Sequence, residues 1–146
     1  MPVTLLSCIL HGLSVTAVEV EVDILSGMPR FTIVGLGDTA IQEAKERIIS
    51  AVRNSGFHYP RTKKTVNLAP ADLKKQGPVF DLPIAAGLLI ASRQIPEPPD
   101  LKKSLIIGEL ALDGSLKRIN GALLLADFAK KNGFERIFLP ETNDYE

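Results

Sequence analysis

The sequence predicts a single α+β domain, spanning residues 1–146, with a mixed β-sheet and about three helices. Strand-like segments fill the first 34 residues, whereas helical periodicity begins only later and then alternates with further strand-like segments. That order of elements is typical of α+β proteins. A chain of 146 residues can also bury roughly 70% of its unfolded surface around one core, so a single unit is expected.

The N-terminal segments read as strands. Residues Val18–Ile24 alternate strictly between apolar and acidic side chains, which indicates a half-buried antiparallel strand with one wet face. Val3–Leu10 is more uniformly apolar, and His11-Gly12 is the expected turn between these two strands. After a turn at 26–29, Arg30–Val34 gives a third strand, so the simplest start is an antiparallel meander.

The first helix is expected after the turn Gly35–Asp38. Thr39 followed by Gln42 fits a capping box, and Gly56 is placed to end the helix in a left-handed conformation. Apolar residues recur between them at helical spacing: Ile41, Ala44, Ile48 and Val52. Lys63–Leu68 then forms another strand.

The second helix is expected to be buried. Asp81 can cap it, Pro83 is tolerated in its first turn, and the segment Leu82–Ala91 is apolar nearly all round. A strand follows over Leu105–Leu112.

The C-terminal part is predicted as a hairpin, a helix and a last strand. Asp113-Gly114 is a strong turn signal that leads into Ser115–Ile119. Asn120 is expected to cap a helix that runs to Lys131 and is closed by Gly133, before a short strand over Arg136–Leu139.

Composition excludes several classes of protein. Seventeen basic and seventeen acidic residues cancel, so the whole chain has no net attraction to nucleic acid or to anionic membranes. The single cysteine, Cys8, excludes an internal disulfide and a cysteine-rich zinc site. No Lys or Arg precedes Arg30 and no apolar run approaches the ~20 residues of a membrane span, so a cytoplasmic protein without a membrane partner is expected.

The segment from Val66 to Pro83 carries the most information about function. It reads as a buried strand, a basic loop and an abrupt helix start, and α/β proteins often place functional residues at such junctions. Yet no Ser, Thr, Cys or His lies between Gly77 and the helix, and none of the eight serines stands in a recognisable frame with a base. The loop Asn67–Gly77 is therefore interpreted as a contact surface without a catalytic group of its own.

Basic residues flank the strand Lys63–Leu68 at both ends. They serve either as solubility residues or as contacts for a phosphate backbone or a partner. The candidate contact residues are Arg61, Lys63, Lys64, Asn67, Lys74 and Lys75, with Lys74 and Lys75 as the proposed phosphate contacts.

Other patterns have simpler explanations. Gly35-Leu36-Gly37 lacks the remaining residues of a dinucleotide or nucleotide loop, so a tight turn is preferred. His11 and His58 have no metal-ligand spacing. The row Glu19, Glu21 and Asp23 could approach a divalent cation, but a solvated strand face explains it better, and no metal or cofactor is expected in this chain.

Six ordered motifs give the chain a family resemblance that covers essentially its whole length. They are Thr32–Leu36, Glu43–Arg47, Asn54–Phe57, Asn67–Leu73, Phe80–Ala85 and Gly108–Gly114. In this order they resemble the N-terminal domain of the bacterial Mg-chelatase-like AAA+ ATPases, the competence protein ComM group.

The resemblance implies a fold similar to the proteolytic domain of Lon protease, without its catalytic dyad. Lon-type peptidases carry a serine just after a Gly-Pro at this helix start, and matching Gly77-Pro78 puts Val79 there. They also carry a lysine on the helix after a Gly-Glu hairpin, and matching Gly108-Glu109 puts Leu123 there. Neither side chain can act as nucleophile or base, so this chain is not expected to be an enzyme.

The resemblance further implies that a AAA+ module, binding ATP and Mg²⁺, follows residue 146. The expected function is that of a non-catalytic accessory domain, which assists ring assembly or guides DNA in an ATP-driven protein of branch migration, recombination and competence. Its expected partners are its own AAA+ module, neighbouring ring subunits and single-stranded or branched DNA. Two alternatives remain open: a hydrolase using, for example, Asp72 and Asp81 as paired carboxylates, or a standalone nucleic-acid-binding domain.

Overall fold

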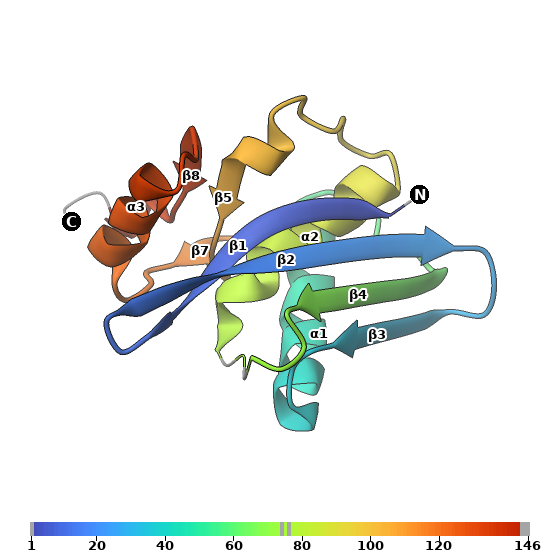
Figure 1. Ribbon diagram of the computed structural model, residues 1–146. Helices are drawn as coiled ribbons and strands as arrows, with labels where there is room; N and C mark the ends of the chain where they lie inside the picture. Colours follow the sequence, from blue (N-terminus) through green and yellow to red (C-terminus); the bar gives the residue numbers. More distant parts are fainter. Residues whose placement is uncertain (1, 74, 76, 144–146) are drawn as a thin grey trace.

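The computed structural model of the protein describes residues 2–73, 75 and 77–143. Six strands form a mixed sheet in the order β3-β4-β2-β1-β5-β8, and a separate hairpin pairs β6 with β7 (Figure 1). The strands are β1 Val3–His11, β2 Ser14–Leu25, β3 Arg30–Val34, β4 Lys63–Ala69, β5 Ser104–Ile106, β6 Glu109–Leu110, β7 Leu116–Lys117 and β8 Arg136–Phe138. The helices are α1 Asp38–Asn54, α2 Asp81–Ala91 and α3 Ala122–Lys131, with short 3₁₀ turns η1 Pro78–Phe80, η2 Leu101–Lys103 and η3 Glu141–Asn143.

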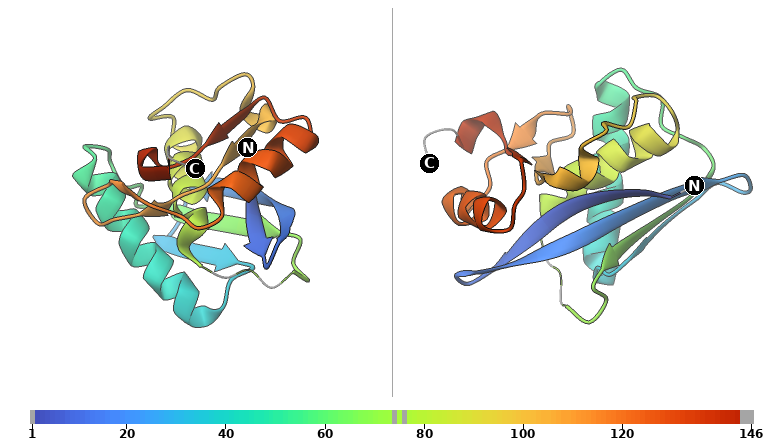
Figure 2. Two further views of the ribbon diagram at one scale, coloured as in Figure 1. Left: turned by 90° about the vertical axis from the view of Figure 1, so that its left-hand side faces the viewer. Right: turned by 45° about the horizontal axis from the view of Figure 1, so that its top comes forward.

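Helices α1 and α2 lie together on one face of the sheet (Figure 2). Side chains from β1 belong to two separate hydrophobic clusters. Leu5 and Ile9 belong to the main core with α2, whereas Cys8 packs in a second, smaller core with Leu125 of α3. The predicted α+β class with a mixed sheet is confirmed. No helix among the described residues is long and apolar enough to cross a membrane.

The long strand β2 has the predicted alternation. Val18, Val20 and Val22 are fully buried, while Glu19 between them is exposed. The strand pairs antiparallel with β1, with His11 opposite Ser14 across the predicted turn. The period of two residues thus identifies both the strand and its buried face.

Strand β3 does not continue an antiparallel meander, so that prediction is wrong. It pairs in parallel with β4, with Arg30 opposite Lys63 and Val34 opposite Asn67. Parallel neighbours need a long crossover, and α1 supplies it between β3 and β4. This β3-α1-β4 unit carries β4 back beside β2 and brings its end to the junction that leads into α2.

The predicted side-chain caps of the helices are wrong. Helix α1 begins at Asp38 after Gly37, ahead of the predicted cap Thr39, and no side chain caps it. Gly121, and not Asn120, precedes α3 and adopts φ +77°. Asp81 is the first residue of α2 and caps nothing, because its carboxylate is bonded elsewhere. The helix ends are as predicted, since Gly56 and Gly133 both have positive φ.

The strand predicted over Leu105–Leu112 is two strands, β5 and β6. The chain leaves the main sheet at Ile107-Gly108, where Gly108 N–H donates to the Val79 carbonyl at 2.9 Å. The Gly108 carbonyl accepts from Leu82 N–H at 3.0 Å. This break seats the β6–β7 hairpin against the start of α2. The predicted turn at Gly114 is confirmed, with φ +93°.

Candidate functional site at the β4–α2 junction

The chain passes from β4 to α2 through Pro70–Gly77 and the η1 turn, at the end of the sheet next to the β3–α1 turn (Figure 1). Lys74 and Gln76 lie outside the described residues, so nothing follows for the predicted contact at Lys74. The described neighbour Lys75 defines how the loop is held.

Lys75 is buried, with 3% of its surface exposed. Its Nζ donates to the Leu73 carbonyl at 2.8 Å and to the Pro70 carbonyl, so it binds its own loop from within. Burial lowers the pKa of Lys75, and Asp72 opposes that shift. In this arrangement the ammonium is a structural group, and the interpretation of Lys75 as a free phosphate contact is not supported.

The lysine stem also closes the space above Gly35. A β-carbon on Gly35 would lie 2.6 Å from the Leu68 carbonyl oxygen and 3.0 Å from Lys75 Cε. Gly35 has φ +104°, a conformation that side chains disfavour. The glycine therefore allows the β3–α1 turn and the loop to touch directly.

Lys64 lies at the opposite end of β4 and is buried in the same manner. Its Nζ donates to the carbonyls of Pro60 and Thr62 at 2.7 and 2.6 Å, and lies 4.8 Å from the ring centre of Tyr59. Burial lowers the pKa of Lys64. Lys64 thus binds backbone carbonyls just before β4, and Lys75 binds backbone carbonyls just after it.

The remaining candidates are not gathered in one place. Arg61 and Lys63 are exposed at the start of β4, while Lys75 follows its end. Seven strand residues at ~3.3 Å each separate the two ends by about 20 Å. Asn67 is half-buried, and its Nδ2 donates to Glu21 Oε1 at 2.9 Å across to β2. The structure therefore divides the predicted basic group into two ends of one strand.

The start of α2 holds an ion pair between the buried Asp81 and the half-buried Arg47, which sequence reasoning missed. Arg47 of α1 donates from Nε to Asp81 Oδ2 at 2.6 Å and from Nη2 to Oδ1 at 3.1 Å. Leu110 N–H of the β6–β7 hairpin donates to the same Oδ2 at 3.2 Å. Asp81 is 1% exposed, so one carboxylate joins α1, α2 and the hairpin.

The pKa values of both partners are shifted. Burial raises the pKa of the Asp81 carboxyl, and the bonds from Arg47 and Leu110 oppose that rise. The hydrogen bond to Asp81 raises the pKa of Arg47. Asp72 is exposed, whereas both oxygens of Asp81 are occupied within the protein, so the geometry does not favour the two carboxylates as a catalytic pair.

A cavity of about 360 Å³ opens beside Val79, the residue at the serine position of the Lon resemblance. Its lining is Ile9, Leu10, Pro78, Val79, Glu109, Arg118, Ile119 and Asn120. Leu123, at the corresponding lysine position, does not line it and is 66% exposed. This described lining includes no serine, threonine, cysteine, histidine or lysine.

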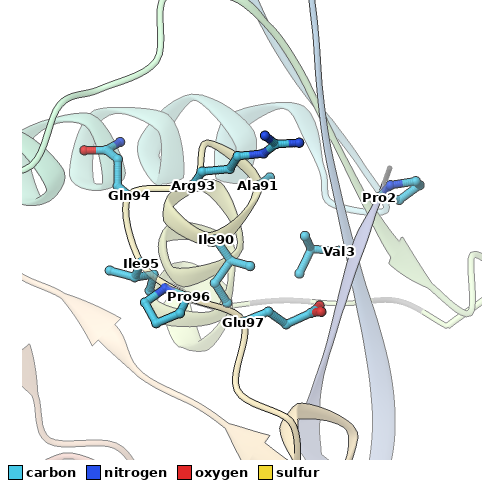
Figure 3. Close-up of a pocket in the computed structure, with 9 residues that line it drawn as sticks. All are labelled: Pro2, Val3, Ile90, Ala91, Arg93, Gln94, Ile95, Pro96 and Glu97. Atoms are coloured by element: carbon cyan, nitrogen blue, oxygen red, sulfur yellow. The ribbon is translucent and has the colours of Figure 1, made fainter.

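A larger cavity, of about 550 Å³, lies between the end of α2 and the start of β1. In Figure 3, Arg93 and Glu97 lie on opposite sides of Ile90, and both extend toward the strand that carries Val3. Because this cavity combines one cation and one anion with apolar residues, its lining does not indicate one class of ligand. Among the described residues, no group of His, Cys, Asp and Glu could hold a metal ion.

The fold and this junction define an α+β domain in which a strand-to-helix site is built from buried structural charges. The model of the family "Subunit ChlI of Mg-chelatase" matches residues 20–143, and the chain belongs to this Mg-chelatase-like family.

Three relatives resemble it over most of its length. YifB of Escherichia coli (strain K12) is 44% identical over 133 residues, which is 91% of this chain and 26% of the relative. Competence protein ComM of Haemophilus influenzae is 42% identical over 144 residues, 92% of this chain and 28% of the relative. Rv2897c of Mycobacterium tuberculosis is 39% identical over 137 residues, 94% of this chain and 27% of the relative. The chain thus spans about a quarter of the length of these curated relatives.

Proposed function

We propose that this chain is a non-catalytic accessory domain of a Mg-chelatase-like AAA+ ATPase, which assists ring assembly or guides DNA in a competence-type protein. The observation that carries the proposal is the state of the β4–α2 junction. Its Gly-Pro helix start presents Val79 to a cavity, while the nearby charges Lys75 and Asp81 are bonded within the protein.

A hydrolytic site needs a nucleophile or an activated water beside a group that can exchange protons. The described junction offers Glu109 and Arg118 at the Val79 cavity, and Arg118 has partners of its own. What the junction does offer is a set of internal polar bonds, because Asp81 joins three elements and Lys75 donates to the carbonyls of Pro70 and Leu73. These features suit a docking or guiding element of a larger machine.

The names of the relatives and of the family support the proposal that this domain works within a larger protein of the competence type. One of them is named a competence protein, and the family is named for a subunit of Mg-chelatase. ATP and Mg²⁺ would act at a AAA+ module and not in this chain.

The test is a hydrolysis screen of this chain with casein, fluorogenic peptides and ATP, alongside Asp72→Asn. We expect no turnover above a heat-denatured control. Turnover that copurifies with the folded chain and is abolished by Asp72→Asn, a change at an exposed residue, would establish the hydrolase instead.

A further inference from the structure

Two cationic side chains lie against Tyr59 at the entry of β4. Arg53 of α1 lies 5.7 Å from the centre of the Tyr59 ring, and the buried Lys64 lies 4.8 Å from it. Tyr59 packs against Phe31 of β3 with ring centres 6.4 Å apart, and Lys45 lies 5.8 Å from the Phe31 ring. The two rings thereby bring cations from α1 and from the β4 entry to one end of the sheet.

Three further exposed cations, Arg30, Arg61 and Lys63, extend this group. Arg30 is opposite Lys63 in the β3–β4 register, and Arg30 N–H donates to the Thr62 carbonyl at 3.4 Å. Arg61 is exposed in the segment between Tyr59 and Lys63. We call the solvent-accessible members the Tyr59 basic cluster: Arg30, Lys45, Arg53, Arg61 and Lys63.

No ion pair among the described residues neutralises the charges of this cluster. None of its five members forms an ion pair with a described residue, whereas Arg47, Lys103, Lys131 and Arg136 all do. Contact with an aromatic face positions a cation without cancelling its charge. No acidic residue occurs from Arg47 to Ala71, the stretch that holds Arg53, Arg61 and Lys63, whereas Glu46 follows Lys45 directly. Asp23, the nearest acid in the strand register, lies opposite Thr65.

The cluster is also not a consequence of overall composition, because the chain has equal numbers of basic and acidic residues. The buried Lys64, 4.8 Å from the centre of the Tyr59 ring, adds one more basic group beside the exposed ones. A local excess of cations on a neutral protein attracts a polyanion to that place in particular.

We propose that the Tyr59 basic cluster binds the phosphate backbone of a nucleic acid without reading its bases. The proposal gives a location to the DNA contact in the proposed function and rests on that function. It moves the contact from Lys75 to the opposite end of β4.

The surroundings favour a nucleic acid over an acidic peptide. Phe31 is 8% exposed and Tyr59 is half-buried, so neither ring offers a free face for base stacking, and binding should not depend on sequence. No member of the cluster lines the two cavities described above or the apolar cavity that has Val52, Phe57 and Leu89 in its lining, so its cations do not face a described apolar pocket that could anchor peptide side chains. Separate cations on three elements suit a repeating phosphate chain.

The experiment is fluorescence anisotropy with a labelled oligonucleotide of about 20 nucleotides, single-stranded or duplex, at about 50 and about 200 mM salt. The test variant combines Arg53→Gln, Arg61→Gln and Lys63→Gln. The matched control combines Lys102→Gln, Lys117→Gln and Lys130→Gln, which removes the same charge from exposed sites elsewhere. Circular dichroism verifies that both variants are folded.

We expect the cluster variant to lose about 100-fold in affinity at low salt, and its salt slope for the single strand to fall by about 2, because three phosphate contacts are removed. The control should stay within a few-fold of the parent chain. Equal losses in both variants, or no salt-dependent binding by the parent chain, would overturn the proposal. So would stronger binding of a polyglutamate peptide of equal charge, which would assign the surface to an acidic protein.

Failure of this proposal is distinguishable from failure of the proposed function. Loss of the DNA contact here leaves the role in ring assembly intact, and that role is measured by removing the domain from a complete relative, as described at the end of the Discussion.

Discussion

Arg47 and Asp81, which are 34 residues apart, form a two-pronged ion pair at 2.6 and 3.1 Å that joins α1 to the first residue of α2. The same carboxylate accepts from Leu110 N–H, so the pair also holds the β6–β7 hairpin. The pair thus joins the elements around the start of α2, directly after the 3₁₀ turn that contains Val79.

Removal of one partner of this pair should destabilise the fold strongly. Arg47→Ala leaves a carboxylate that is 1% exposed without its cation, and we expect a loss of about 3–5 kcal/mol in the free energy of unfolding. Urea denaturation at neutral pH measures the change.

The matched control is Lys103→Ala, which removes the exposed Lys103–Glu135 pair and should cost less than about 1 kcal/mol. A double variant, Arg47→Met with Asp81→Leu, should lose less than the sum of its single changes, because no charge is then left unpaired. Similar small losses at both pairs would show that the buried pair has no structural role.

Charge reversal should separate the structural lysine from the surface lysine. Lys75→Glu places a carboxylate against the Pro70 and Leu73 carbonyls and should destabilise by more than about 3 kcal/mol. Lys63→Glu changes an exposed side chain and should stay within about 0.5 kcal/mol. Thermal denaturation of both variants tests this, and a stable Lys75→Glu chain would contradict the burial of Lys75.

Gly35→Ala should be among the most disruptive single-methyl changes. The added β-carbon would lie 2.6 Å from the Leu68 carbonyl oxygen at a φ of +104°, and the combined clash and strain should cost about 3 kcal/mol. Gly12→Ala is the control, because Gly12 has φ +59° but nothing within 4 Å of the added carbon. We expect the control to lose only about 1–2 kcal/mol from backbone strain in urea denaturation. Equal losses would show that the contact above Gly35 is not tight.

The buried thiol of Cys8 should make stability fall in alkali. Burial raises its pKa from 9.0 to about 12, so between these values the unfolded chain has lost a proton that the folded chain keeps. Stability therefore decreases as pH rises through this range, and the contribution reaches about 1.4 kcal/mol at pH 10. Urea denaturation between pH 8 and pH 10 should give a shallower decline for Cys8→Ala than for the parent chain. Identical slopes would contradict the shift.

Local periodicity accounts for what the sequence could predict. The alternation around Val18, Val20 and Val22 identifies β2 and its buried face, and the uniformly apolar segment after Asp81 identifies α2 as central. Both patterns are fixed by neighbouring residues. The parallel partner of β3 is a non-local choice, and strand alternation does not encode it.

The candidate site was harder to predict for a physical reason. Lysines are rarely buried, so a basic loop indicates a surface contact, yet Lys64 and Lys75 each find carbonyl acceptors in their own turns. Such acceptors depend on backbone geometry. The pairing of Arg47 with Asp81 likewise depends on the placement of α1 against α2. The only signal was that both residues fall within the family motifs Glu43–Arg47 and Phe80–Ala85.

The most direct test of the accessory role uses a complete relative, the Competence protein ComM of Haemophilus influenzae, with and without the segment that matches this chain. ATP turnover is measured with and without forked DNA, and ring formation by analytical ultracentrifugation. We predict that the shortened protein still turns over ATP without DNA but loses ring assembly, DNA-stimulated turnover or both. Unchanged assembly and unchanged DNA stimulation after removal of the segment would contradict it.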